Sequence, residues 1–380
     1  MRGLALLLLL WLPELGVGFP ELSSSHHRPG ELGGSPRRPQ RQLNASAWRP
    51  PRAPEEAEIR AQLREILENP GPENPPGGDP WYDDGSYGPL LLRLAWHTSA
   101  HYSPVDTPHG GSNGATMRFA PEIDYHDNRG LELAREILLP VQAAHPEISV
   151  SDLWILAGYE SVEALGGPHI EMAWGRVDAT ADQAPEICPP SERLPDWDDS
   201  TSTIREKFGR MGFGDRDIVA LIGAHTVGKG HPERMGFPFR NWDNSPVRFD
   251  SQYFDFVLSK GTGPPGWDLV VEDDPTRPGE VIRWFEPSSR GGWFMLATDL
   301  MLRDVPEFRV HSEEFYEDEA AFHAAFADAF KRVTELGFMF RPGAATSFGS
   351  TRCARAKQLR GGAAAARSGG CPFAKTDDGE

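Results

Sequence analysis

The feature that most constrains the fold is a short run that places a cation, an indole and an imidazole on one helix face. Arg93, Trp96 and His97 stand three and four positions apart, so on a helix their side chains project to the same side. A packed core rarely accepts such groups, because buried polar atoms need partners. The run therefore predicts a pocket in which a small polar substrate is deprotonated and a leaving charge is stabilised. His225 could approach this pocket from the opposite side, as an axial ligand to a metal or haem.

Both parts of this prediction have a plainer alternative. A pair spaced like Arg93 and His97 ordinarily marks a solvated helix face, yet leucines at 91, 92 and 94 flank it here and favour a pocket. A lone histidine on an apolar helix, such as His225, is usually a satisfied core residue. The spacing alone therefore leaves the role of His225 open.

The composition allows a substantial core and argues against nucleic acid as a partner. The 380 residues suffice for one large or two ordinary domains, and 11 Trp and 20 Phe supply apolar material. The net charge of −18 lies in the body of the chain, because residues 1–54 contain seven Arg against three Glu. Nucleic-acid phosphates would be repelled by such a body, whereas a basic protein partner would not. Cys188, Cys353 and Cys371 form no disulfide framework, although a Cys353–Cys371 bridge is conceivable.

The N-terminal region has the composition of a targeting segment. Residues 1–18 combine an early Arg, a short apolar run and small residues, which predicts a signal peptide too short to span a bilayer. Residues 19–55, rich in Arg, Pro and Ser, predict a disordered linker or a transit segment. We expect the protein to enter the secretory pathway and to be secreted or lumenal. The alternative is a plastid reached by a bipartite signal, which Phe19 favours because it directly follows the expected cleavage point. The sequon at Asn44 is usable only in a secretory lumen. We expect no integral membrane protein.

Helical periodicity over residues 56–340 predicts one mostly α-helical domain. We expect helices near 59–67, 90–101, 131–144, 151–165 and 319–336, another from Asp215 leading into His225, and one opened by a capping box at Thr203 and Glu206. Two apolar runs between 267 and 294 predict a β-hairpin insertion. The absence of a 20–50-residue repeat excludes solenoids and propellers. Residues 341–380, rich in Gly, Ala and Arg, predict a flexible tail.

Several segments, taken in their order along the chain, resemble one known family. They include Gly88-Pro-Leu-Leu-Leu-Arg-Leu-Ala-Trp-His97, the loop 110–122, Asn128-Arg-Gly130, Gly175-Arg-Val-Asp178, Arg193-Leu-Pro-Asp196 and Gly223-Ala-His225-Thr-Val-Gly228. Together they resemble the class I haem peroxidases, the group that contains cytochrome c peroxidase, ascorbate peroxidase and catalase-peroxidase. The resemblance covers about residues 58–340. It implies a haem peroxidase fold, in which two helical bundles sandwich one b-type haem, bound non-covalently because no Cys-x-x-Cys-His is present.

The resemblance also implies roles on the distal side of the haem. His97 would move a proton between the two oxygens of hydrogen peroxide, since a neutral imidazole titrates near neutrality. Asn128 would hold the other ring nitrogen, and Arg93 would stabilise charge on the departing oxygen. Trp96 occupies the family's indole position beside them.

On the proximal side, the resemblance implies His225 as the axial ligand of the iron. Asp299, in Phe294-Met-Leu-Ala-Thr-Asp299, would accept the proximal ring N–H and make the imidazole a stronger donor. Trp242 would lie under the haem, although one extra residue separates it from His225 relative to the family pattern. The same segments of ascorbate peroxidases supply potassium ligands, which predicts a potassium or calcium site at Thr226, Asp243, Ser245 and Asp250.

The resemblance leaves the electron donor open between two candidates. Arg234 stands at the position of the ascorbate-binding Arg of ascorbate peroxidases, and a guanidinium suits an anionic enediol. The Lys that this family places before the distal helix is missing. We expect reduction of hydrogen peroxide to water with ascorbate or a similar small one-electron donor, and as the alternative with a basic cytochrome c. A hypothesis from another class is a haem-binding sensor or inactive scaffold on the same fold.

Overall fold

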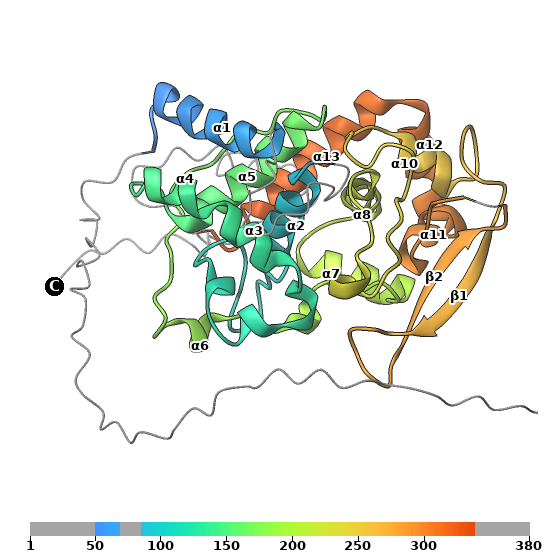
Figure 1. Cartoon of the computed structure of the whole chain (residues 1–380), viewed down its shortest axis with the longest axis horizontal. Helices are drawn as coiled ribbons and strands as arrows, with labels where there is room; N and C mark the ends of the chain where they lie inside the picture. Colours follow the sequence, from blue (N-terminus) through green and yellow to red (C-terminus); the bar gives the residue numbers. More distant parts are fainter. Residues whose placement is uncertain (1–49, 69–84, 290, 339–380) are drawn as a thin grey trace, which may run out of the picture. The chain divides into compact units, whose positions relative to one another are not determined.

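Helices are the predominant regular element of the described residues, as the labels in Figure 1 show. The computed structural model describes residues 50–68, 85–289 and 291–338. The α-helices are α1 (Ala53–Glu68), α2 (Gly88–Ser99), α3 (Leu131–Ile137), α4 (Leu139–Ala144), α5 (Val150–Ala164), α6 (Ala184–Ile187), α7 (Thr201–Arg210), α8 (Asp215–Ile222), α9 (Pro232–Met235), α10 (Gln252–Val257), α11 (Ala297–Asp304), α12 (Pro306–Glu317) and α13 (Glu319–Thr334). The 3-10 turns are η2 (Thr116–Arg118), η3 (Glu122–Asp124), η4 (His126–Asn128), η5 (Ser191–Arg193) and η6 (Gly223–Thr226), and the strands are β1 (Trp267–Asp273) and β2 (Val281–Pro287).

Some of the predictions concern other parts of the chain. The signal peptide 1–18, most of the 19–55 segment, Asn44, the tail 341–380, Cys353 and Cys371 lie outside the described residues. Among the helices of the described ranges, none combines the length and the apolar character needed to span a membrane.

Helix α2 forms the centre of a first helical bundle. Its leucines are buried on several sides, and Pro89 stands in the first turn, where a helix does not need the missing N–H. Helix α5 crosses α2 closely at Gly158, where an added Cβ would lie 2.4 Å from the Cβ of Ala95. Helix α1 packs on α5 and α4, and α3 packs on α2 and α4. A side chain at position 158 would therefore separate the two helices that anchor this bundle.

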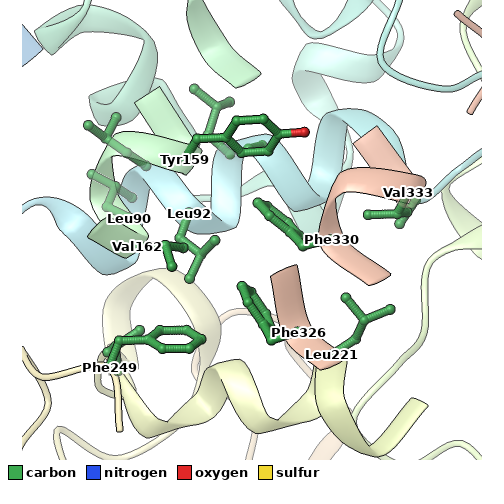
Figure 2. Packing of buried hydrophobic residues seen from close by; sticks show 14 of the residues in the cluster. Leu90, Leu92, Tyr159, Val162, Leu221, Phe249, Phe326, Phe330 and Val333 are labelled. Atoms are coloured by element: carbon green, nitrogen blue, oxygen red, sulfur yellow. The ribbon is translucent and has the colours of Figure 1, made fainter. Parts of the chain in front are cut away.

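Helices α8, α10, α11, α12 and α13 form a second bundle. Helix α12 contacts each of the other four, and α13 also contacts α2, so that it joins the two bundles. Figure 2 shows side chains from α2, α5, α8 and α13 converging around Phe326 and Phe330, whose rings stack with centroids 5.2 Å apart. The mostly α-helical, two-bundle architecture predicted from the sequence is confirmed.

The predicted insertion is a two-stranded antiparallel hairpin. β1 and β2 pair in a register that sets Val270 opposite Trp284 and Asp273 opposite Val281. Because side chains alternate across a strand, Ile282 and Trp284 point into the protein and are buried, whereas Leu269 and Val271 lie on the opposite face and are exposed. Within the described residues, β1 is an edge strand with β2 as its one partner.

Two expected helix boundaries were wrong. The single helix expected over 131–144 is divided into α3 and α4, because Pro140 lacks the N–H that would bond back to the carbonyl of Glu136. The expected capping box at Thr203 is also displaced. Helix α7 begins at Thr201, and the hydroxyl of Ser200 accepts the N–H of Thr203 at 3.2 Å, so Ser200 is the N-cap.

Candidate active site

A cavity of about 300 Å³ lies between α2 on one side and α8 and η6 on the other. Its lining is mainly apolar, with contributions from Leu221, Phe326 and Phe330, which also appear in Figure 2. Arg93, Trp96, His97, His225, Trp242 and Arg234 all line it. The structure therefore brings together six of the residues proposed from the sequence, although they are spread between positions 93 and 242 of the chain.

On the α2 side of the cavity, His97 is held in one orientation. Its Nδ1 lies 3.1 Å from Oδ1 of Asn128, and Nδ2 of Asn128 donates to the backbone carbonyl of Glu122 at 2.9 Å. Because the amide NH₂ is committed to Glu122, the amide oxygen faces the ring and accepts from Nδ1–H. The lone pair of His97 is then on Nε2. Burial, with Arg93 nearby, holds the pKa of His97 well below its usual value, so the imidazole is unprotonated and can accept a proton.

Arg93 is fixed by the same segment that holds His97. Its Nη1 donates to the carbonyl of Arg129 at 2.8 Å, and its Nη2 donates to the carbonyl of Asp127 at 2.6 Å. These carbonyls flank Asn128, so three consecutive residues orient both polar groups of the distal helix. Trp96 stacks on Phe208 with ring centroids 5.7 Å apart.

On the opposite side, His225 lies in η6 and not in the α-helix that was expected to reach it. Helix α8 ends at Ile222, and Gly223 begins the tighter turn. An added Cβ at Gly223 would lie 2.7 Å from the ring of Phe322, so the absent side chain lets this turn pack against α13. The turn carries His225 to the cavity wall.

Asp299 organises the proximal side through four hydrogen bonds. Oδ1 accepts from Nδ1 of His225 at 2.7 Å and from the hydroxyl of Tyr253 at 2.6 Å. Oδ2 accepts from Nε1 of Trp242 at 2.8 Å and from the backbone N–H of Leu296 at 2.7 Å. The carboxylate is fully buried, so these donors replace the water that would otherwise solvate it.

The extra residue before Trp242 does not move its indole away from His225. The two rings stack with centroids 4.6 Å apart and an interplanar angle of 24°. Tyr253 is the member of this group that sequence reasoning missed. It follows Trp242 by eleven positions, but nothing local in the sequence shows that its hydroxyl reaches position 299. Burial, together with the nearby carboxylate of Asp299, raises the pKa of Tyr253 well above its usual value, so the phenol remains a donor.

The residues of the cavity fit a haem. His225 and His97 line it from opposite sides, and the remaining lining is mostly apolar, as a large conjugated ring requires. Since Asp299 occupies Nδ1 of His225, Nε2 is the atom available to an iron. The Nδ1 of His97 faces Asn128, which leaves Nε2 as the other ring nitrogen of this side chain.

Arg234 lines the same cavity from α9. Its side chain packs against the loop before α3, where an added Cβ at Gly130 would lie 3.1 Å from Cδ of Arg234. Gly130 has a φ of +81°, which also favours glycine. The guanidinium is therefore set beside the segment that holds Asn128.

The proposed cation residues form a cluster just behind His225. The hydroxyl of Thr226 donates to Oδ2 of Asp243 at 2.8 Å and approaches Oδ1 of Asp250 at 3.4 Å. The backbone N–H of Ser245 donates to Oδ1 of Asp243 at 2.8 Å. Burial raises the pKa of Asp243 to about 7. Among the described residues, no group of three or more His, Cys, Asp or Glu side chains has metal-binding geometry, so hydroxyl and backbone oxygens would have to complete a site here.

Comparison with known proteins agrees with this arrangement. A family model described as Peroxidase matches residues 61–318. The mitochondrial cytochrome c peroxidase of Aspergillus fumigatus is 44% identical over 259 residues, which are 68% of this chain and 66% of that relative. The mitochondrial cytochrome c peroxidase of Emericella nidulans is 43% identical, with 68% of this chain and 67% of that relative covered. A putative heme-binding peroxidase of Cryptococcus neoformans var. neoformans is 41% identical over 281 residues, 73% of this chain and 77% of that relative. The chain thus spans just under two thirds of the first of these relatives.

Proposed function

The chain belongs to the peroxidase family, as a class I haem peroxidase, and we propose that it reduces hydrogen peroxide to water with electrons from a one-electron donor. One observation carries this proposal. A single cavity has an oriented neutral base and a cation on one wall and a histidine bonded to a buried carboxylate on the other. Haem, when bound through His225, supplies the redox chemistry.

The distal residues supply the proton transfers of this reaction. Nε2 of His97 takes the proton from one oxygen of hydrogen peroxide and delivers it to the other oxygen, which leaves as water. The low pKa of His97 keeps the imidazole in its basic form below the pH at which an ordinary histidine becomes protonated. Arg93, always cationic, stabilises the charge that develops on the departing oxygen.

The proximal residues adjust the electron density at the iron ligand. Asp299 draws the Nδ1 proton of His225 towards itself, which makes Nε2 a stronger donor and favours oxidised iron. Tyr253 and Trp242 donate to the same carboxylate and moderate this effect, because each hydrogen bond takes up part of its charge.

Stopped-flow absorbance of the haem-loaded protein tests the reaction. The Soret band of the wild type should shift within a second of adding equimolar peroxide. His97→Leu should slow this shift by about 100- to 10,000-fold, the usual contribution of a general acid–base group. A wild-type band that does not respond to peroxide would instead support the haem-binding scaffold.

For the donor, we propose ascorbate or a similar small anion at Arg234, because this guanidinium lines the haem cavity. The second candidate is cytochrome c. It is supported by the printed names of two relatives, by the acidic body of the chain, and by the stacking of Trp242 on His225, which gives an electron a path to the site.

Peroxide turnover with ascorbate and with ferrous cytochrome c, measured side by side, distinguishes the donors. If ascorbate is the donor, Arg234→Ala should abolish most of the ascorbate turnover. Arg240→Ala should leave it intact, because Arg240 pairs with Glu286 and does not line the cavity. Preference for cytochrome c, suppressed by salt and unchanged by Arg234→Ala, would establish the second candidate.

A bound cation at Asp243 is a further part of this proposal. Two carboxylates and two hydroxyl-bearing residues near η6 offer hard oxygen ligands suited to potassium or calcium. Either ion should raise the melting temperature of the wild type and not that of Asp243→Asn. An equal rise in melting temperature for the two proteins would reject a cation site at Asp243.

For the location, we propose that residues 1–55 carry an organelle or secretory address. The notable apolar run at 4–12 favours a signal peptide, with a plastid as the alternative destination, whereas the names of two relatives point to mitochondria for those proteins. A fusion of residues 1–55 to a fluorescent protein, followed by microscopy and N-terminal sequencing, distinguishes these destinations. Cleavage near residue 18 would support the signal peptide, and import into mitochondria would reject it.

A further inference from the structure

The connection between β1 and β2 reaches across to the distal side of the cavity. Thr276 and Arg277 lie in this connection. Thr276 Oγ1 is 3.1 Å from Nε2 of His126, and Nη2 of Arg277 is 2.6 Å from Nδ1 of the same ring. Arg129 Nη1 donates to the carbonyl of Thr276 at 2.9 Å. His126, Asp127, Asp274 and Arg277 all line the cavity, so the contact forms part of its wall.

The segment that these hydrogen bonds hold, residues 126–129, also orients the distal residues. His126 and Arg129 bracket Asn128, which orients His97. The carbonyls of residues 127 and 129 accept the two hydrogen bonds that fix Arg93. Any shift of residues 126–129 therefore moves the partners of both groups at once.

We propose that the hairpin tip is a positioning element of the distal site, acting through a clasp formed by His126, Thr276 and Arg277. The inference rests on the proposed peroxidase function, because it concerns the same distal groups. The clasp residues do not perform the proton transfer. They hold the backbone of residues 126–129 in the place where Asn128 and the two carbonyls meet His97 and Arg93.

The clasp requires a neutral His126. Arg277 can only donate, so Nδ1 must accept, and Nε2–H then donates to the hydroxyl of Thr276. That hydroxyl in turn donates to Oδ1 of Asp274 at 2.7 Å, which completes a continuous set of donors and acceptors. Protonation of Nδ1 would place two donors against each other.

The charges around His126 favour this neutral state. Burial, followed by Arg277 and Arg129, lowers the pKa of His126, while the carboxylates of Asp127 and Asp274 oppose the shift. Hydrogen bonds from Thr276 and from the backbone of Arg277 hold the pKa of Asp274 below its usual value despite its burial, so the acceptor at the end of the clasp remains ionised.

Two substitutions at one position separate positioning from simple packing. Glutamine at 126 retains one acceptor and a donor, so His126→Gln should preserve the clasp, whereas His126→Leu removes both functions. Arg283→Leu is the control, because it removes a cation from β2 on the exposed face of the same hairpin. Each protein is loaded with haem. The affinity for cyanide, whose proton the distal base must accept, is then measured from the Soret band, together with amide hydrogen exchange of residues 126–130.

The expected result for His126→Leu is a loss of about 10-fold in cyanide affinity. This is smaller than the roughly 100-fold loss of rate that a 1 Å misplacement of a reacting group can cause. Exchange at residues 126–130 should accelerate in the same variant. His126→Gln and Arg283→Leu should match the wild type in both measurements. His126→Leu with wild-type affinity and exchange would overturn the clasp, and so would His126→Gln behaving like His126→Leu. If peroxide does not shift the Soret band of the wild type but the variants still differ in cyanide affinity, the proposed function is rejected and the clasp is supported.

Discussion

Removing the hydroxyl of Tyr253 should make the protein less stable and its iron harder to reduce. In Tyr253→Phe, Oδ1 of Asp299 loses the donor at 2.6 Å and keeps the one from His225 at 2.7 Å. Its other oxygen retains the donors from Trp242 and Leu296. The charge formerly shared with the phenol then acts on His225, whose Nε2 becomes a stronger donor to the iron.

The size of both effects follows from the type of bond that is lost. A hydrogen bond to a charged group contributes about 1.5–3 kcal/mol, so the free energy of unfolding should fall by about 2 kcal/mol. If about half of this energy distinguishes the two oxidation states of the iron, the difference is about 1 kcal/mol. A one-electron couple changes by 59 mV for each tenfold, or about 1.4 kcal/mol, so the reduction potential should fall by about 40 mV.

Spectroelectrochemical titration of the haem-loaded protein measures the potential, and urea unfolding measures the stability. Tyr159→Phe is the matched control. This phenol is also fully buried, and its hydroxyl lies 2.5 Å from Oγ1 of Thr334, away from the proximal group. The control should lose less stability, about 1 kcal/mol, because its partner is a neutral hydroxyl, and its reduction potential should not change. A potential for Tyr253→Phe that rises, or equals that of the control, would refute the transmission of charge through Asp299.

Three other substitutions test the packing, the buried acid and the distal orientation. Gly158→Val should lower the free energy of unfolding in urea by about 2 kcal/mol or more, because its Cβ would lie 2.4 Å from that of Ala95; an unchanged midpoint would contradict the close crossing. Burial raises the pKa of Glu122 to about 7, so the folded protein keeps a proton that the unfolded chain releases. As the pH rises from the ordinary carboxyl pKa to pH 7, the free energy of unfolding of the wild type should therefore fall by up to about 1.4 kcal/mol per pH unit. Glu122→Gln should flatten this slope in melting curves recorded at several pH values. Parallel slopes for the two proteins would argue against a protonated Glu122. Asn128→Val should slow the stopped-flow reaction with peroxide by about 10- to 100-fold, because His97 loses its orienting partner, and a rate within twofold of the wild type would assign that orientation to other groups.

Much of the architecture could be predicted from the sequence because its signals are local. The apolar spacing of the helices and the turn between β1 and β2 depend on neighbouring residues. The break at Pro140 is also local, but the apolar spacing continues through it and predicts one helix. The shared face of Arg93 and His97 likewise follows from a spacing of four. The resemblance to a known family then identified His225 and Asp299 as partners, which spacing alone could not do.

What could not be predicted depends on contacts between distant segments. The hydroxyl of Tyr253 reaches a carboxylate 46 positions away, and a buried tyrosine gives no sign of the acceptor it will find. The bond between His126 and Arg277 joins residues 151 positions apart. Before the structure is known, His126 is one histidine in a polar loop. Long-range hydrogen bonds of this kind have no periodicity that a sequence could display.

The hairpin also carries an edge strand, and its charges bear on how the protein behaves at high concentration. Strands with unpaired backbone groups can recruit another chain into a shared sheet, and the exposed Leu269 and Val271 would add apolar contact to such pairing. Carboxylates at Asp268, Glu272 and Asp273 lie along the same strand. Two copies of β1 aligned edge to edge would bring these negative charges together and repel each other. Acidic side chains along β1 thus oppose the edge-to-edge pairing that its exposed apolar residues would favour.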